Sequence, residues 1–255
     1  MNVESTPAHA YFRFYAELND HLPPEQQYGT QEKLFFVPST VKDMIESFGV
    51  PHTEVELIII NGESSDFSRV VRDQDRIGVY PMFESLDITP ALRVRSQALR
   101  NPKFVLDVHL GKLAAYLRML GFDALYRSCY GDAELVRISS TEHRVLLTRD
   151  RGLLKHSAVS HGYWLRETDS RRQAAEVAWR FDLAHYIRLF TRCMACNGVI
   201  QPVSKKQVRH LLLPRTAELH EEFRQCPQCS RVYWKGTHYA RMRRWMEELT
   251  CTAHP

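Results

Sequence analysis

The chain lacks the long apolar segments of membrane proteins and the N-terminal pattern of secreted ones. None of its apolar runs approaches the roughly 20 residues that a membrane-spanning helix needs. Its first residues lack the basic start and apolar core of a signal peptide. We therefore expect a cytoplasmic protein without a membrane partner. In that compartment its six cysteines are expected to be reduced thiols or metal ligands rather than disulfides.

Basic residues are scarce at the N-terminus, and acidic residues are scarce towards the C-terminus. Residues 1–90 hold 15 Asp and Glu against 6 Lys and Arg, residues 91–170 hold 8 against 13, and residues 171–255 hold 7 against 15. A basic C-terminal two-thirds suits a polyanionic partner, since affinity for phosphates comes largely from Lys and Arg. An ordinary solvated surface is the simpler alternative, and charge alone does not exclude it.

Residues 9–83 have the element order of a β-grasp fold. Strands are expected at 10–18, 33–37, 56–60 and 75–80, with a helix at 41–48 for which Ser39 and Thr40 both offer an N-cap. The stretches FVPSTVKDMIESFGVPHTEVELIIING and DQDRIGVYPMF resemble the ubiquitin-like sulfur-carrier proteins. Those carriers work through a C-terminal Gly-Gly, whereas this chain has Tyr80-Pro81-Met82-Phe83 at the corresponding place. We therefore expect an accessory role, such as binding a protein partner, rather than carrier chemistry.

Residues 103–190 alternate short apolar runs with helical patterns, which predicts a parallel sheet covered by helices. Residues 84–102 before them read as a linker, and residues 170–189 are expected to form a long final helix. Two of the apolar runs are followed by Asp107 and Asp150. Ligands gather beyond the carboxyl ends of such strands, so we expect both side chains at one edge. Asp132 begins another helical pattern, where it either caps the helix or ligates a metal.

The central stretches FVLDVHLGKLAAYLRMLGFDALYRS, GDAELVRI and RVLLTRDRGLL resemble the Mut7-C ribonuclease family, a branch of the PIN-like metal-dependent nucleases. The resemblance extends to about residue 245, and the β-grasp segment is similar to the ubiquitin-like domain of some members. It implies a nuclease that holds Mg²⁺ or Mn²⁺ on the catalytic residues Asp107, Asp132 and Asp150. Ala133 stands where many relatives carry a second acidic residue, so reduced metal affinity or activity is one possible consequence.

Basic residues near these aspartates are candidates for holding an RNA backbone. Those nearest in sequence are Lys112, Arg118, Arg149 and Arg151. Metal-assisted hydrolysis needs such cations only for positioning, since a metal-bound water supplies the nucleophile.

Two CxxC pairs, separated by 29 residues, predict a zinc ribbon over residues 191–250. The expected ligands of a structural Zn²⁺ are Cys193, Cys196, Cys226 and Cys229. Iron–sulfur ligation is the lesser alternative. The surrounding basic residues Lys205, Lys206 and Lys235, interleaved with the aromatics Tyr233, Trp234, Tyr239 and Trp245, suit single-stranded RNA. The aromatics Tyr233 and Trp234 suit the core of a small ribbon equally well.

The sequence thus predicts an α/β protein in three parts: a β-grasp domain, a PIN-like parallel-sheet nuclease domain and a zinc ribbon. The expected activity is metal-dependent hydrolysis of RNA phosphodiester bonds, assisted by the ribbon. A non-catalytic RNA-binding adaptor, which Ala133 favours, is one alternative. A toxin-like nuclease specific for a structured RNA such as tRNA is another.

Overall fold

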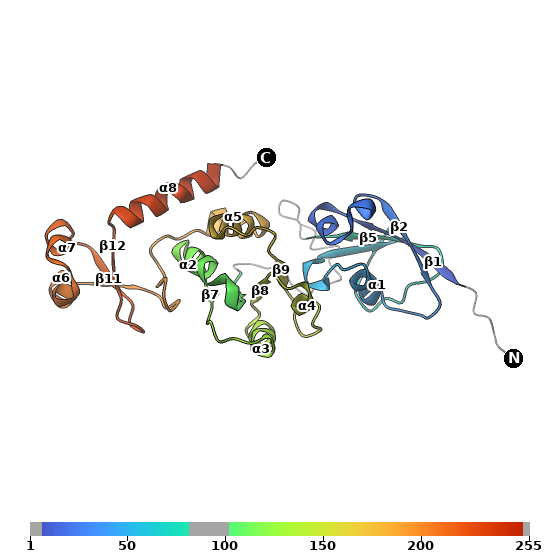
Figure 1. Cartoon of the computed structure of the whole chain (residues 1–255), viewed down its shortest axis with the longest axis horizontal. Coiled ribbons are helices and arrows are strands. Elements are labelled where there is room, and N and C mark those ends of the chain that lie inside the picture. Colours follow the sequence, from blue (N-terminus) through green and yellow to red (C-terminus); the bar gives the residue numbers. More distant parts are fainter. Residues whose placement is uncertain (1–6, 82–101, 252–255) are drawn as a thin grey trace. The chain divides into compact units, whose positions relative to one another are not determined.

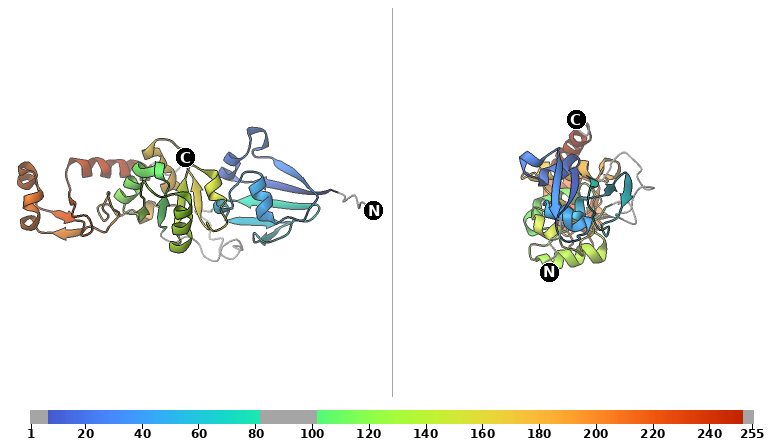
Figure 2. Two further views of the ribbon diagram at one scale, coloured as in Figure 1. Left: turned by 60° about the horizontal axis from the view of Figure 1, so that its bottom comes forward. Right: turned by 90° about the vertical axis from the view of Figure 1, so that its right-hand side faces the viewer.

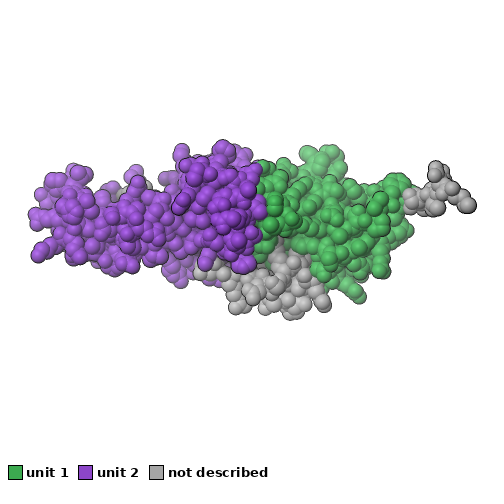
Figure 3. Space-filling view, turned by 90° about the horizontal axis from the view of Figure 1, so that it is seen from below, with its two compact units in different colours: residues 1–100, 150–164 green, residues 101–149, 165–255 purple. Residues whose placement is uncertain are grey.

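The computed structural model describes residues 7–81 and 102–251 (Figure 1). The predicted linker at 84–102 lies outside these residues, except for Pro102. The chain divides into two compact units, one of residues 1–100 and 150–164 and the other of residues 101–149 and 165–255 (Figure 3). In the described portion of the chain, no helix is long and apolar enough to span a bilayer.

The first unit contains a five-stranded β-grasp sheet with the order β2-β1-β5-β3-β4 (Figures 1 and 2). Its strands are β1 (Ala8–Phe14), β2 (Thr30–Phe35), β3 (Leu57–Ile60), β4 (Glu63–Ser65) and β5 (Asp75–Tyr80). Strands β1 and β5 are parallel, and the other pairs are antiparallel. The predicted β-grasp fold is therefore confirmed.

One helix, α1 (Val41–Ser47), packs on this sheet. Thr40 caps it as predicted, because its side-chain oxygen accepts a hydrogen bond from the Asp43 amide at 3.2 Å. Short 3₁₀ helices fill the connections: η1 (Ala16–His21), η2 (Pro24–Gln26) and η3 (His52–Glu54). The predicted first strand is too long, since the chain turns at Ala16 with a φ of 47° and continues as η1.

Residues 150–164 fall inside the predicted nuclease domain, yet they belong to the same compact unit as the β-grasp sheet. They contain α4 (Arg151–Leu154) and β9 (Gly162–Trp164). Three hydrogen bonds join them to η3 and the end of α1: His52 Nε2 with the Val159 carbonyl at 3.0 Å, Lys155 Nζ with the Glu46 carbonyl at 2.9 Å, and the Trp164 amide with Glu54 Oε1 at 2.6 Å. The N-terminal domain therefore holds the segment that begins with Asp150.

The second sheet has the order β7-β6-β8-β9. Strand β6 (Phe104–Leu106) is parallel to both β7 (Ala124–Leu125) and β8 (Val145–Thr148). Every residue of β6 and β8 is buried, as expected of strands covered on both faces. Helices α2 (Gly111–Met119) and α5 (Ser170–Arg180) pack together, and α3 (Asp132–Glu142) lies across the strands from them (Figure 1). The predicted parallel-sheet α/β domain is confirmed.

The predicted final helix at 170–189 is wrong in its length. Helix α5 ends at Arg180, and Asp182 follows with a φ of 43° before the 3₁₀ helix η6 (Ala184–Tyr186). The apolar pattern continues past Arg180 because Leu183 is fully buried, although the backbone there is no longer an α-helix. Another 3₁₀ helix, η5 (Val108–Leu110), connects β6 with α2.

The cysteine-bearing segment forms a three-stranded antiparallel sheet of β10 (Gln201–Val203), β11 (Phe223–Gln225) and β12 (Val232–Trp234). The short helices α6 (Lys205–Val208), η7 (Arg209–Leu211) and α7 (Pro214–Leu219) connect β10 with β11. After β12 comes α8 (Thr237–Cys251), which the sequence analysis did not predict. Helix α8 contacts α2, where the rings of Tyr116 and Trp245 are 5.3 Å apart.

Candidate functional site

Four cysteine side chains lie close together beside the connection between β11 and β12. The sulfur atoms of Cys193, Cys196, Cys226 and Cys229 all lie within 4.8 Å of one another. Two of the separations are 3.5 Å, from Cys193 to Cys229, and 3.4 Å, from Cys196 to Cys226. Tetrahedral ligation with metal–sulfur bonds of about 2.3 Å places sulfur atoms about 3.8 Å apart. The cluster therefore has the donor set and the spacing of a closed tetrahedral metal site.

Both CxxC pairs have the same local backbone. In each pair the residue four positions after the first cysteine, Asn197 or Ser230, has a positive φ of 71° or 59°. Its amide donates to the carbonyl of that first cysteine, at 2.9 Å for Cys193 and 2.8 Å for Cys226. The tight turn brings the two sulfur atoms of a pair to one side, which explains why the spacing CxxC suits metal ligation.

The protonation chemistry of the cluster favours a bound cation. Burial opposes ionisation of the Cys193 thiol, but hydrogen bonds from Tyr233 and from the amides of Cys196 and Ala195 outweigh it and lower the pKa of Cys193 to about 6. Burial raises the pKa of Cys196 to about 12, and the neighbouring thiols, first that of Cys226, add to the rise. Four thiolates so close together repel one another, and a metal cation removes that repulsion.

A buried arginine joins the first cysteine pair to the α/β domain. The guanidinium of Arg118, on α2, donates to the carbonyls of Ala124 at 2.8 Å, Ala195 at 2.8 Å and Met194 at 3.1 Å. Burial lowers the pKa of Arg118, and the nearby Cys193, Cys196 and Asp123 side chains oppose that change. The buried side chain of Arg118 is bound to protein carbonyls, which favours a structural role for it, and its contact with RNA stays a prediction.

Asp123 also connects the first cysteine pair to the α/β domain, a role that the sequence did not indicate. Its carboxylate accepts hydrogen bonds from Arg144 at 2.7 Å, from Asn197 Nδ2 at 2.7 Å and from Arg192 at 3.3 Å. Burial raises the pKa of Asp123, but these hydrogen bonds and the two positive charges outweigh burial and lower it. Its partners lie 21 to 74 positions away in the chain, so no local sequence pattern indicates these contacts.

Asp107 lies at the carboxyl end of β6, as predicted. It is partly buried and caps η5, where Oδ1 accepts a hydrogen bond from the Val108 amide at 2.6 Å. Oδ2 accepts a hydrogen bond from the hydroxyl of Thr148, at the end of β8, at 2.7 Å. Thr148 is fully buried and fixes the orientation of this carboxylate, a role that the sequence analysis missed.

The other two predicted catalytic aspartates lie at helix starts with exposed side chains. Asp150 caps α4 through a 2.7 Å hydrogen bond from the Gly152 amide to Oδ1. Asp132 is the first residue of α3, and the capping position belongs to Gly131. The interpretation of Asp132 as a helix cap is therefore wrong, since its side chain makes no capping hydrogen bond.

The four cysteines form a compact set of possible metal ligands among the described residues, and Asp107, Asp132 and Asp150 are not part of it. The assignment of these three aspartates as Mg²⁺ or Mn²⁺ ligands stays a prediction.

Arg151, one of the predicted RNA contacts, packs within the first unit. Its guanidinium lies 4.2 Å from the centre of the Trp164 ring and donates to the His21 carbonyl at 3.4 Å. This cation–π contact gives Arg151 a structural role in holding α4 to β9 and the N-terminal domain.

The other predicted RNA contacts lie at the surface. Lys112, Arg149 and Lys206 are exposed. Lys205 pairs with Glu221 at 2.5 Å and Lys235 with Glu222 at 3.0 Å. Because such exposed ion pairs contribute only about 0–1 kcal/mol, they would exchange readily for a phosphate.

Comparison with known protein families gives two matches. Residues 102–246 match the Mut7-C RNAse domain, and residues 7–87 match the Mut7-C ubiquitin domain. No curated protein matches the chain. The match to the Mut7-C RNAse domain covers both the parallel sheet and the cysteine cluster, and the match to the Mut7-C ubiquitin domain covers the β-grasp sheet.

Proposed function

The chain belongs to the Mut7-C RNAse domain family, and from this premise we propose that it is a metal-dependent ribonuclease that hydrolyses RNA phosphodiester bonds. The observation that carries the proposal is the position of Asp107 at the carboxyl end of β6, with its carboxylate held by Thr148. We assign residues 9–83 to the ubiquitin-like domain, residues 103–190 to the nuclease domain and residues 191–250 to the ribbon.

Asp107, Asp132 and Asp150 would hold the catalytic Mg²⁺ or Mn²⁺. Carboxylate oxygens are the ligands that these hard cations prefer, and a bound ion would supply an activated water and stabilise the leaving oxygen. Each carboxylate oxygen has two lone pairs, so Asp107 can accept the Thr148 hydrogen bond and still bind a metal. Thr148 would orient Asp107 in the way that outer hydrogen bonds commonly orient metal ligands.

We further propose that the cysteine cluster holds a structural Zn²⁺. With four sulfur ligands such a site has no open position for a catalytic water, so its role would be to stabilise the ribbon. Four reduced thiols suit a cytoplasmic location. The N-terminal domain would serve as an accessory module with a protein partner rather than as a sulfur carrier.

Cleavage of RNA by purified protein tests the main proposal. Asp107→Asn and Asp150→Asn are each expected to reduce Mn²⁺-dependent cleavage by at least about 100-fold, since each removes a charged metal ligand. Asp182→Asn is the matched control, because Asp182 is exposed and its φ of 43° also suits asparagine. Cleavage that persists unchanged in the double variant Asp107→Asn plus Asp150→Asn would overturn the proposal. Calorimetric titration of Mn²⁺ into the same proteins measures the site directly.

A non-catalytic RNA-binding adaptor is the second candidate function. Ala133, beside Asp132 in the exposed first turn of α3, favours it because the set of carboxylates is small. An adaptor would bind RNA with an affinity indifferent to Mg²⁺ and Mn²⁺ and would not cleave it. The substrate panel should include a folded tRNA, since a toxin-like nuclease of narrow specificity would ignore generic RNA.

A further inference from the structure

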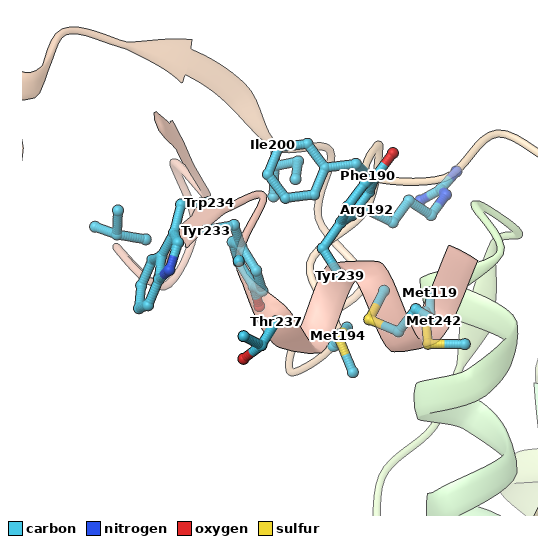
Figure 4. Close-up of a pocket in the computed structure, with 12 residues that line it drawn as sticks. Met119, Phe190, Arg192, Met194, Ile200, Tyr233, Trp234, Thr237, Tyr239 and Met242 are labelled. Carbon is cyan, nitrogen blue, oxygen red and sulfur yellow. The ribbon is translucent and has the colours of Figure 1, made fainter. Parts of the chain in front are cut away.

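Two adjoining cavities lie in the second unit, where α8 packs beside α2 and the three-stranded sheet that carries the cysteines; Figure 4 shows the first of them. The first has a volume of about 250 Å³ and the second a volume of about 360 Å³. Met119, Met194 and Met242 line both cavities. The two cavities therefore adjoin at these three methionines, and we call them together the α8 groove.

The walls of the α8 groove are aromatic. The first cavity is lined by Phe190, Tyr233, Trp234 and Tyr239, and the second by Tyr116 and Trp245. The rings of Phe190 and Tyr239 meet edge to face at 5.4 Å, and Figure 4 shows them at the cavity with Met119 and Met242. Each cavity is near or below the lower end of the roughly 300–1,000 Å³ that drug-sized ligands occupy. Flat groups the size of single nucleobases suit such spaces.

Two of these aromatic residues, Phe190 and Tyr233, have a structural role, because both pack against the small core around Cys193 and Cys226. The hydroxyl of Tyr233 lies 3.0 Å from Cys193 Sγ, and its ring packs against the small core of the cysteine ribbon. Trp234, Tyr239 and Trp245 are only partly buried and have no such bond to the cluster among the described contacts. Together with the partly buried Tyr116, they are the aromatic residues of the groove outside the ribbon core.

The charged side chains that line the groove are cations, although the carboxylate of Glu248 on α8 lies near enough to Arg171 to act on its charge. The described lining residues of the groove include the cations Lys112, Arg171, Arg192 and Arg241, and no carboxylate. Arg192 is engaged with Asp123, and Arg171 donates to the Tyr116 hydroxyl at 3.3 Å. Lys112 and Arg241 are exposed, on α2 and α8 respectively. A cavity lined by apolar and aromatic side chains together with cations suits a ligand that is flat, aromatic and negatively charged.

We propose that the α8 groove binds a single-stranded segment of RNA, with bases against Trp234, Tyr239 and Trp245 and phosphates beside Lys112 and Arg241. Proteins that bind single strands combine stacking aromatics with a cationic groove in this way. A duplex hides the faces of its bases, so it would not use the aromatic walls. The choice of RNA over DNA rests on the proposed ribonuclease function. The proposal that the groove binds a single strand does not depend on that function.

Fluorescence anisotropy with a labelled 12-nucleotide single-stranded RNA tests this proposal. The full chain is used with its native metal content and with Asp107→Asn to prevent cleavage. Trp245→Ala is expected to weaken binding by about 5–100-fold, which corresponds to the usual contribution of one stacked base. Trp245→Phe should restore most of the affinity, and thermal melting checks that each variant is folded.

Two arginines of α8 provide a matched pair of charge variants. Arg241 lines the groove, whereas Arg243 lies two positions along the helix and pairs with Glu247 at 3.0 Å. Arg241→Gln is expected to reduce the slope of log affinity against log salt concentration by about 0.7, the value for one phosphate contact on a single strand. Arg243→Gln should leave that slope nearly unchanged.

Three results would overturn the groove proposal. They are equal effects of Arg241→Gln and Arg243→Gln, unchanged affinity in folded Trp245→Ala, and equal affinity for the single strand and for its duplex. Its failure is distinguishable from failure of the ribonuclease proposal, which depends on cleavage by the protein with Asp107 intact. Normal cleavage with no effect of the groove variants on binding would overturn only the groove proposal. Binding that depends on the groove residues, without any cleavage, would overturn only the ribonuclease proposal.

Discussion

Arg118 is the residue whose environment departs most from its sequence pattern. On a helix, between apolar positions, an arginine near a candidate active site suggests a surface contact to phosphate. Its side chain instead crosses from α2 to the first cysteine pair and donates to three backbone carbonyls. Arginine suits this position because its planar guanidinium has several hydrogen-bond donors and remains charged even when it is buried. The sequence identified the cysteines, but it did not indicate which residue connects them to the rest of the unit.

Replacing Arg118 with methionine should destabilise the second unit. The variant Arg118→Met keeps much of the apolar stem but leaves the carbonyls of Ala124, Met194 and Ala195 without their donor. The expected loss is about 2–4 kcal/mol in the free energy of unfolding, since each buried polar group left unpaired costs about 1–3 kcal/mol. Urea unfolding of metal-loaded protein measures it. Arg127→Met, at an exposed position, is the control, and equal midpoints for the two variants would contradict the prediction.

Asp123 should make the stability of the second unit dependent on pH. Its folded-state pKa is lowered, so its contribution is present above the unfolded-state pKa and is lost as the pH falls through the folded-state value. Asp123→Asn should therefore be less stable than the wild type at pH 7, by about 1–3 kcal/mol for the lost hydrogen bonds to charged groups. The difference should narrow as the pH falls from about 4, the ordinary pKa of an aspartate in the unfolded chain, through the lower folded-state pKa. A constant difference across that range in urea unfolding would contradict this origin.

At the scale of elements, patterns that local chemistry determines were predicted closely. Strand β5 has the expected bounds, Asp75–Tyr80, and α1 begins after Thr40 as its cap predicts. Elements whose ends depend on distant contacts were predicted less well. Helix α5 ends nine residues before the predicted Leu189 because the backbone turns at Asp182. Strand β4 was not predicted, although Asn61 and Gly62 form the tight turn that leads from β3 into it. Helix α8 was missed because its aromatic residues were assigned to the ribbon.

The three strands of the cysteine ribbon should depend on the metal. Each strand has three residues, and the buried core cluster consists of Cys193, Ile200 and Cys226. Such a small core supplies little stability without a bound ion. A strong chelator should therefore remove most protection against hydrogen exchange from β10 to β12 and leave β1 and β5 protected. Mass spectrometry of exchanged peptides measures this, with Cys129→Ser as a control because Cys129 is exposed and outside the cluster. Unchanged protection would show that the ribbon folds without metal.

For the whole molecule, the sequence predicted the three parts but not their division into packed units. The β-grasp, parallel-sheet and cysteine-rich parts follow from periodicity and spacing, which are local properties. The grouping of residues 150–164 with the N-terminal domain depends on Glu54, His52 and Glu46, about 100 positions earlier in the chain. No periodicity connects such residues, so this division could be found only in the folded chain. The segment that begins with the predicted catalytic Asp150 consequently packs with the N-terminal domain.

The buried pair of Glu54 and His21 should control how firmly that segment is held. Glu54 Oε2 is 2.9 Å from His21 Nε2, Glu54 Oε1 accepts from the Trp164 amide at 2.6 Å, and both side chains of the pair are fully buried. Glu54→Ala removes one member of a buried pair, which typically costs about 3–5 kcal/mol, and also removes the partner of β9. Hydrogen exchange in residues 150–164 should therefore accelerate at least about 100-fold while α3 and β6 stay protected. Glu63→Ala, at an exposed position on β4, is the matched control. If exchange in 150–164 is as slow in Glu54→Ala as in Glu63→Ala, the buried pair does not hold the segment, and the prediction is wrong.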